Sequence, residues 1–324
     1  MGTFFSGPSI TPNAFVRYLA AKKTVDDRAL NRQVWDALQR AVAERPQPLQ
    51  VLELGAGIGT MIERTLAAGL WQQAGYTALD VDATLLDTAR LRLPTWATAH
   101  GWEVMDTGEG LRFYRHDRRV DVRLEVADCL DFARAQAGRR SWDVLLAHAF
   151  LDLVDLPTAL PLFLELLRPG GLFYFTLTFD GVTAFQPELD PAFDARLEAA
   201  YHGTMDERRV AERPSGDSRS GRHLLALLMQ MPVTILAAGP SDWLVWPQGG
   251  RYPDGEAFFL HAIVDTVGKA LTGHPDIDPE RLAAWLTARH AQIERGELIY
   301  LAHQLDVLGR VEMANVRSPR SLPR

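Results

Sequence analysis

Short apolar runs and amphipathic stretches alternate over the first 180 residues of the chain. The runs predict buried strands, and they lie at 51–54, 76–80, 122–126, 142–147 and 172–177. Between them, helical periodicity predicts helices at 61–68, 83–90 and from Pro157 to about residue 167. Because strands alternate with helices, we predict an α/β fold with a doubly wound, mostly parallel sheet and helices on both faces.

Further elements are predicted on either side of this region. Apolar residues recur at every fourth position from Leu30 to Val42, which predicts an amphipathic helix capped by Asp26 or Asp27. The other predicted segments are helices at 14–22, 192–202, 224–229, 257–271 and 279–295, strands at 234–238, 242–246 and 297–308, and an inserted hairpin at about 100–116.

The first predicted strand runs directly into the glycine-rich turn Glu53-Leu54-Gly55-Ala56-Gly57-Ile58-Gly59-Thr60. Gly55 permits a tight turn, Gly57 lets a ligand approach the backbone, and Gly59 lets helix and strand pack closely. Such a turn alone is a weak signal, because dinucleotide enzymes, nucleoside enzymes and structural turns share it. Thr60 stands at the sixth position of the dinucleotide fingerprint, where glycine or alanine is typical, and this disfavours NAD.

Two aspartates follow the second predicted strand. Asp80 ends the strand about twenty residues after the glycine turn, so its carboxylate is expected at the carboxyl edge of the sheet. There it can accept hydrogen bonds from both hydroxyls of a ribose. Asp82 is predicted to cap the helix that follows.

The order of these features resembles the class I S-adenosylmethionine (SAM)-dependent methyltransferases. The resemblance rests on Glu-x-Gly-x-Gly-x-Gly at 53–59, on Asp80, and on a strand and helix that lead through Arg-Pro-Gly-Gly at 168–171 into an aromatic strand. It covers most of residues 50–180. It implies a seven-stranded sheet with one antiparallel strand, SAM as cofactor and S-adenosylhomocysteine as product, and it is silent about the substrate.

The resemblance also implies a set of cofactor-binding residues. Glu53 is expected to face the amino group of SAM, Asp80 the ribose and Asp128 the adenine. A simpler interpretation of Asp128 is that it caps the following helix. The full set of residues expected at the cofactor is Glu53, Gly55, Ala56, Gly57, Gly59, Asp80, Val81, Asp128, Cys129 and His148.

The methyl acceptor is expected at the carboxyl ends of the fourth and fifth strands. His148 and Asp152 are the candidate catalytic residues, with His148 the preferred general base because an imidazole can take a proton at neutral pH. A structural histidine is the alternative. The candidate substrate-binding residues are Tyr18, Arg28, Phe150, Arg219 and Arg222, and for the polar ones a solvated surface with helix caps is the competing interpretation.

Four segments are expected from this organisation. Residues 1–48 are predicted to form an N-terminal helical lid and residues 49–180 the SAM-binding core. Residues 181–316 are predicted to supply insertions that cap the substrate, together with the final strands, and residues 317–324 a disordered tail.

Composition narrows the class of partner. Of the 324 residues, 47% are hydrophobic and 23% charged, which is typical of a globular protein. The net charge of −7 disfavours nucleic acid as a partner. The single cysteine, Cys129, excludes an intrachain disulfide, and with no signal peptide or long apolar run visible we expect a cytoplasmic protein without a membrane segment. No metal site is expected, since the spacing of Asp152, Asp155 and Asp180 is not specific for one.

We therefore predict a SAM-dependent methyltransferase that acts on a small molecule or, less favoured, a peptide. Two alternatives stay open. One is another Rossmann-like enzyme, either an aminopropyltransferase-like protein or an NAD(P) oxidoreductase. The other is a non-catalytic protein that binds SAM. The sequence gives no indication of the oligomeric state.

Overall fold

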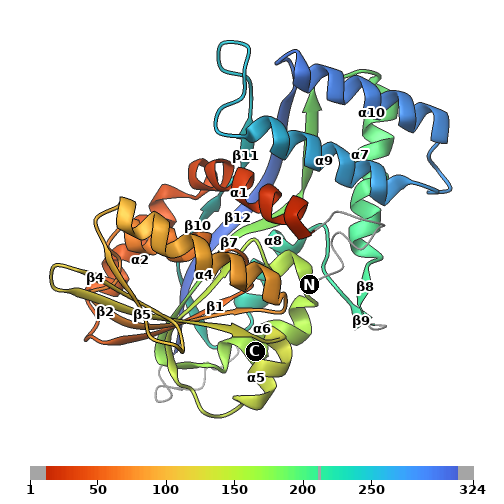
Figure 1. Cartoon of the computed structure of the whole chain (residues 1–324). Helices are drawn as coiled ribbons and strands as arrows, with labels where there is room; N and C mark the ends of the chain where they lie inside the picture. Colours follow the sequence, from red (N-terminus) through yellow and green to blue (C-terminus); the bar gives the residue numbers. More distant parts are fainter. Residues whose placement is uncertain (1–11, 211–212, 313–324) are drawn as a thin grey trace, which may run out of the picture.

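The computed structural model describes residues 12–210 and 213–312, and within them ten strands form one mixed sheet (Figure 1). Five parallel strands form its centre, in the order β5 (Arg118–Val126), β2 (Gln73–Asp80), β1 (Leu49–Leu54), β6 (Trp142–His148) and β7 (Leu167–Gln186). At one edge β12 (Ile299–Val311) pairs antiparallel with β7, followed by β10 (Val233–Pro240), with β11 (Trp243–Val245) also on β12. At the other edge lie β4 (Leu111–Arg115) and β3 (Glu103–Asp106).

Helices cover both faces of this sheet, which confirms the predicted α/β class. One face packs against α2 (Arg32–Ala43), α3 (Thr60–Ala67) and α4 (Ala83–Ala99). The other packs against α5 (Cys129–Ala135), α6 (Leu156–Leu164) and α8 (Ser220–Leu228). No helix of the described chain combines the length and apolar character that a membrane crossing requires.

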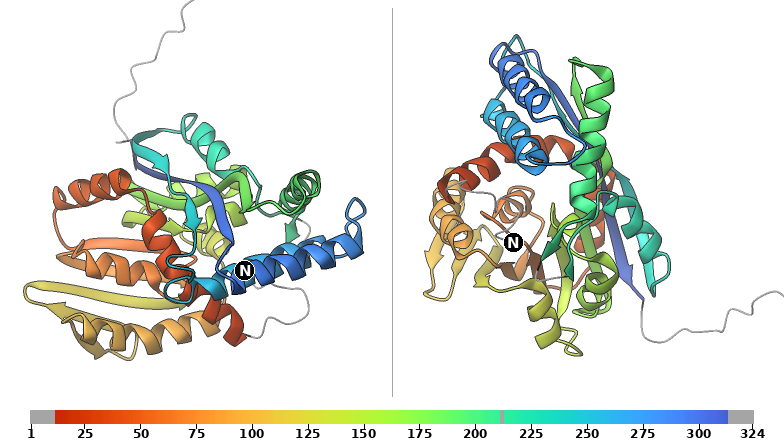
Figure 2. Two further views of the ribbon diagram at one scale, coloured as in Figure 1. Left: turned by 90° about the horizontal axis from the view of Figure 1, so that it is seen from above. Right: turned by 90° about the vertical axis from the view of Figure 1, so that its right-hand side faces the viewer.

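The predicted strand count is wrong for the sheet as a whole. The inserted hairpin is present as β3 and β4, but it pairs with β5 and so extends the sheet, as the left view of Figure 2 shows on the side opposite α10. Together with β11 it raises the count from seven to ten. Both β12 and β4 run against the central strands, so the expectation of one antiparallel strand is also wrong.

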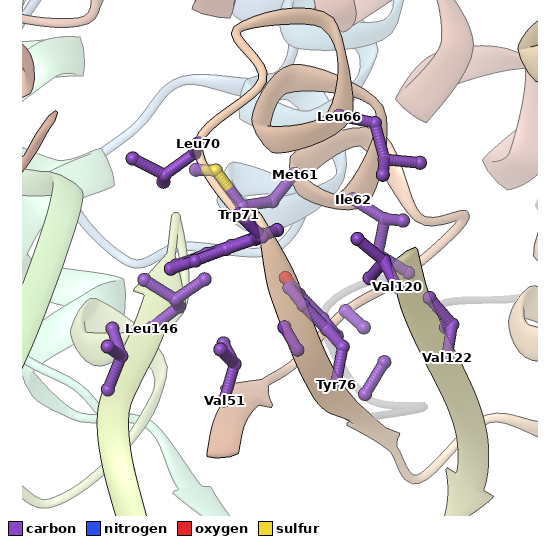
Figure 3. Close-up of a cluster of buried hydrophobic side chains, with 14 of the residues drawn as sticks. Val51, Met61, Ile62, Leu66, Leu70, Trp71, Tyr76, Val120, Val122 and Leu146 are labelled. Atoms are coloured by element: carbon purple, nitrogen blue, oxygen red, sulfur yellow. The ribbon is translucent and has the colours of Figure 1, made fainter. Parts of the chain in front are cut away.

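The core between α3 and the sheet explains the apolar runs of the sequence. Trp71 and Tyr76 meet edge to face with ring centroids 6.4 Å apart, and both are buried. Figure 3 shows Trp71 between Met61 of α3 and the strand residues Val51 and Leu146, with Tyr76 beside it. Neighbouring parallel strands buried on both faces need near-continuous apolar sequences, and this is the pattern that identified them.

The long strands β7 and β12 carry a second helical layer. They continue beyond the central strands, and β7 runs through residue 180, where the sequence predicted a boundary. The helices α7 (Pro191–Asp206), α9 (Glu256–Leu271) and α10 (Pro279–Glu294) pack on this extension through a separate apolar cluster (Figure 1). Phe185 and Tyr300 contribute from the strands, and Phe259 and Trp285 contribute from the helices.

The N-terminal helices divide differently from the prediction. Helix α1 (Pro12–Ala29) passes through Asp26 without a break, and Asn31 caps α2 by accepting a hydrogen bond from the Val34 N–H. Helix α2 packs on the sheet beside β10 and β12, whereas α1 lies between α4 and α9 (Figure 1). The predicted tail at 317–324 lies outside the described residues.

A substitution in α2 tests whether this helix belongs to the sheet layer. Leu38 is fully buried, so Leu38→Ala should lower the free energy of unfolding by about 2–5 kcal/mol. Urea denaturation measures the effect, and Gln33→Ala on the exposed side of α2 should leave stability almost unchanged. A cost near zero for Leu38→Ala would mean that α2 is a loosely attached lid.

Candidate active site

A cavity of about 210 Å³ lies at the carboxyl ends of the central strands. Its walls come from the loops after β1, β2 and β6, from α1 on one side, and from β7, α7, α9, β11 and β12 on the other. The strands β2 and β5 follow β1 on one side of it in the sheet, and the later strands β6 and β7 lie on its other side. The cavity therefore sits at the switch point of the sheet, where open α/β sheets bind ligands.

The glycine turn forms one wall of the cavity, and all three glycines have a positive φ. The angles are 68° at Gly55, 55° at Gly57 and 79° at Gly59, a region that other residues rarely adopt. A Cβ on Gly59 would lie 3.2 Å from Leu93 Cδ1 of α4. The third glycine thus permits a close helix–helix contact, where the sequence suggested a helix–strand contact.

Asp80 ties the end of β2 to this turn. Its Oδ2 accepts the Gly57 N–H at 2.8 Å and its Oδ1 accepts the Asp82 N–H at 3.0 Å. The side chain is buried and lines the cavity; burial raises its pKa, and the two N–H donors oppose that rise. Asp82 caps α4, as predicted, by accepting the Thr84 N–H at 2.8 Å.

Glu53 lies beneath the turn as a buried carboxyl group that also lines the cavity. The Tyr76 hydroxyl donates to its Oε2 at 2.7 Å. Burial raises the pKa of Glu53 to about 8, against the hydrogen bond from Tyr76 and the charge of Arg64. At neutral pH the group is therefore mostly protonated, and a cation brought into the cavity would favour its ionisation.

His148 ends β6 with both ring nitrogens engaged. Arg64 Nη1 lies 2.9 Å from Nε2, and Thr176 Oγ1 lies 2.8 Å from Nδ1. A guanidinium can only donate, so Nε2 accepts and Nδ1–H donates to Thr176. Burial and the charge of Arg64 lower the pKa of His148 to about 4, although Asp26 opposes them. The imidazole is neutral at pH 7.

Asp26 is the anion at the centre of a buried charge cluster made of Lys22, Asp26, Arg64 and His148. Its Oδ2 lies 2.6 Å from Lys22 Nζ, 3.6 Å from Arg64 Nη2 and 3.2 Å from His148 Nε2. Its Oδ1 accepts the indole N–H of Trp243 at 2.9 Å. Burial alone would raise the pKa of Asp26, but the positive charges of Lys22 and Arg64 hold it well below its usual value.

Two backbone positions on the cavity wall adopt unfavourable conformations. Ala149 has a φ of 48° and Leu177 a φ of 52°. The Leu177 N–H donates to Asp306 Oδ1 at 2.8 Å, and Asp306 Oδ2 accepts the Asn31 N–H at 2.8 Å. Left-handed non-glycine residues of this kind are over-represented at functional sites, where the surrounding structure holds them in place.

Asp152, in the short 3-10 helix Leu151–Leu153, presents its carboxyl group to the cavity. Within the described chain, its Oδ1 is buried and has no hydrogen-bond partner. Burial raises its pKa, against the charge of Arg208. Tyr18 and Tyr201 line the same cavity, and burial raises the pKa of each. Asp26 adds to the rise at Tyr18, and Asp152 adds to it at both.

Of the predicted substrate-binding residues, Tyr18 lines the cavity and Arg28 and Phe150 do not. Arg28 forms an ion pair with the buried Glu256 and so joins α1 to α9. Phe150 is buried in the core beneath the cavity, 6.2 Å from the Phe163 ring. The aromatic position after β6 therefore serves packing.

Arg219 and Arg222 also lie outside the cavity, at the start of α8. Arg219 is exposed. Arg222 is held by Asp180. The Nε–H and the backbone N–H of Arg222 donate to Asp180 Oδ1 at 2.8 Å and 2.9 Å. Asp180 thus anchors the first turn of α8.

Four of the expected cofactor residues, Gly59, Val81, Asp128 and Cys129, do not line the cavity. Asp128 is exposed and caps α5 by accepting the N–H groups of Leu130 and Asp131, both at 2.9 Å, which favours the capping interpretation. Val81 is exposed. Cys129 is buried, and burial raises its pKa to about 12, so the thiol is unreactive.

Two of the aspartates considered as metal ligands, Asp155 and Asp180, bind other side chains. Asp180 binds Arg222, and Asp155 precedes α6 and pairs with Thr158. Over residues 12–210 and 213–312, no three His, Cys, Asp or Glu side chains are grouped so that they could hold a metal ion.

Several cavity residues were not singled out as site residues from the sequence. Asp26 was interpreted as a helix cap because the first helix was predicted to end at residue 22, whereas α1 continues to Ala29. Arg64 does not itself line the cavity but contacts His148 and Asp26, which do, and no role was predicted for its side chain. Tyr201 and Trp243 lie far along the chain from the glycine turn, and only the pairing of β12 with β7 and β11 brings them near it.

No protein-family model and no curated protein matches the sequence. Solved structures match at low similarity. Phosphoethanolamine N-methyltransferase 2 of Haemonchus contortus has 12% identity and a TM-score of 0.46; the match covers 96% of this chain, which spans only 59% of that protein. A candidate type II methyltransferase of Anaeromyxobacter dehalogenans has 20% identity and a TM-score of 0.46; the match covers 86% of this chain and 96% of that protein. The [4+2]-cyclase SpnF has 14% identity and a TM-score of 0.43; the match covers 94% of this chain and 95% of that protein. Likeness at this level does not assign a reaction.

Replacement of Glu53 should reveal the cost of keeping this carboxyl group buried. Its pKa rises from 4.5 to about 8 on folding. The free energy of unfolding therefore falls progressively as the pH increases between these values. Glu53→Gln removes the charge and keeps an oxygen for Tyr76. We expect equal stability of variant and wild type near pH 4.5 and a gain of a few kcal/mol for the variant at pH 8, measured by urea denaturation.

The matched control is Glu103→Gln on the exposed Glu103 of β3, which should follow the wild type at every pH. If Glu53→Gln showed no gain at pH 8, Glu53 would be ionised in the folded protein without cost.

Proposed function

We propose that this chain is a SAM-dependent methyltransferase acting on a small-molecule acceptor. The observation that carries the proposal is a single cavity with two chemically different halves. One half contains Glu53, the glycine turn and Asp80. The other is lined by aromatic residues and contains Asp152. A donor and an acceptor could therefore meet in one enclosure at the switch point of the sheet.

The residues of the first half fit the cofactor by their chemistry. The carboxylate oxygens of Asp80 each accept one N–H and have further acceptor capacity for ribose hydroxyls. Glu53 offers a buried acceptor whose ionisation a cationic amino group would favour. The same residue opposes a nicotinamide dinucleotide, because a pyrophosphate at the turn would lie beside it. When bound, SAM supplies a methyl group activated by a sulfonium.

Asp152 is proposed as the catalytic residue, and His148, which the sequence favoured as general base, is proposed as a positioning residue. The unpartnered Oδ1 of Asp152 can accept a proton from an acceptor hydroxyl or ammonium group, and burial makes the carboxylate more basic. The Nε2 of His148 is occupied by Arg64, so we assign His148 to orienting the charge cluster beside the acceptor.

The single buried thiol suits the cytoplasm, which we propose as the location.

The alternatives make different predictions about ligands. An aminopropyltransferase-like enzyme would use the same nucleoside half without transferring a methyl group. A non-catalytic binding protein would bind SAM without turnover. An oxidoreductase would bind NAD or NADP in preference to S-adenosylhomocysteine.

Calorimetric titration tests the donor site directly. S-adenosylhomocysteine should bind the purified protein, and NAD and NADP should not. Gly57→Val should abolish this binding, since it adds a side chain at a cavity position with a φ of 55°. Gly108→Val is the matched control, because Gly108 has a φ of 80° with open space around it, far from the cavity. Binding of NAD alone would overturn the proposal.

A second substitution isolates the ribose contact. Asp80→Ala should weaken S-adenosylhomocysteine by about 1.5–3 kcal/mol, or roughly 10- to 150-fold, if two charge-assisted hydrogen bonds are lost. Asp87→Ala on the exposed face of α4 should leave the affinity unchanged. Thermal melting of each variant separates lost binding from lost folding. An unchanged affinity for Asp80→Ala in a folded protein would remove Asp80 from the ligand.

A further inference from the structure

The half of the cavity away from the glycine turn is walled by aromatic side chains from five elements. They are Phe15 and Tyr18 of α1, Phe179 of β7, Tyr201 of α7, Trp243 of β11 and Tyr300 of β12. Such a wall suits an apolar or aromatic body, and the faces of aromatic rings also attract cations.

The titratable side chains that line the whole cavity are predominantly carboxyl groups. Among the described lining residues, the carboxyl groups are Asp26, Glu53, Asp80 and Asp152, and Lys22 is the single Lys or Arg side chain. The Lys22 ammonium lies 2.6 Å from Asp26 Oδ2, so its charge is already matched. A phosphate or carboxylate on the acceptor would enter this cavity without finding a cation to compensate its lost hydration.

Asp152 is the carboxyl group in the aromatic half. Its Oδ1 is buried and lacks a hydrogen-bond partner within the described residues. Arg208 does not line the cavity; it donates from behind to the main-chain oxygen of Asp152 at 3.0 Å. A buried acceptor of this kind is costly unless a ligand supplies the donor.

We infer that the methyl acceptor is an amine with an aromatic or apolar body, whose N–H groups are held by Asp152. The inference rests on the proposed function and names the substrate class of that site. An ammonium or amine group satisfies the unpartnered carboxyl oxygen, matches the acidic lining and tolerates the aromatic wall. A phosphate, diphosphate or carboxylate group has no donor for that oxygen and does not match the acidic lining.

Matched ligands separate charge from shape. Phenyl, indole and naphthalene bodies, each bearing an ethylamine, an ethyl or a propionate group, are titrated calorimetrically into protein saturated with S-adenosylhomocysteine. We expect at least one amine to bind, at least tenfold more tightly than its neutral partner, and the carboxylates to give no measurable binding. Asp152→Asn should reduce the amine-to-neutral ratio at least tenfold. Asp155→Asn, three residues along and outside the cavity, should preserve it.

The inference is overturned if the carboxylates bind as well as the amines, if no amine binds, or if the wild-type ratio is near one. The wild-type ratio decides even where Asp152→Asn fails to fold, which thermal melting would reveal. Absence of S-adenosylhomocysteine binding counts against the proposed function instead. In that case the ratio of amine to neutral affinity is measured on the protein without S-adenosylhomocysteine. Failure of the proposed function and failure of the amine inference are thus distinguishable.

Discussion

The buried carboxylate of Asp26 is the constraint on which the arrangement of the site depends. It sits among Lys22, Arg64 and His148, and it also accepts the indole N–H of Trp243. These partners come from α1, α3, β6 and β11, so one anion joins both layers of the protein. Breaking a buried pair by removing one partner typically costs about 3–5 kcal/mol, because the remaining charge is uncompensated. Helix α1 is thereby fixed across the cavity.

The cavity lies where two apolar cores meet. One core fills the space between the central strands and their helices, and the other lies under α7, α9 and α10. The strands β7 and β12 belong to both, and their pairing shifts register beside the cavity, between Ala302 and Gln304 and between Leu305 and Val307. The second shift adjoins Leu177, whose strained conformation Asp306 stabilises. A polar, strained junction between two well-packed cores is a suitable place to bind a ligand, because the cores supply the rigidity.

Local signals in the sequence were enough for the central strands and the glycine turn. Apolar runs locate β1 and β6, and the positions of Gly57 and Asp80 predict that they meet, because parallel strands end at one edge. The acceptor half could not be obtained in this way. Arg28 and Lys22 are both polar residues of α1, and only the packing of that helix decides that Lys22 faces the cavity while Arg28 faces Glu256. Such choices depend on contacts between distant segments, which no local pattern encodes.

The hydrogen bond from the Asn31 N–H to Asp306 has a consequence for how the protein is made. It joins residues 275 positions apart, and the ion pair between Arg28 and Glu256 spans 228. During synthesis the N-terminal helices therefore leave the ribosome long before the partners that hold them. The central strands can begin to pair while β12 is still untranslated, but α1 can dock only when nearly all of the chain is available. The site is therefore complete only after its C-terminal partners have been made.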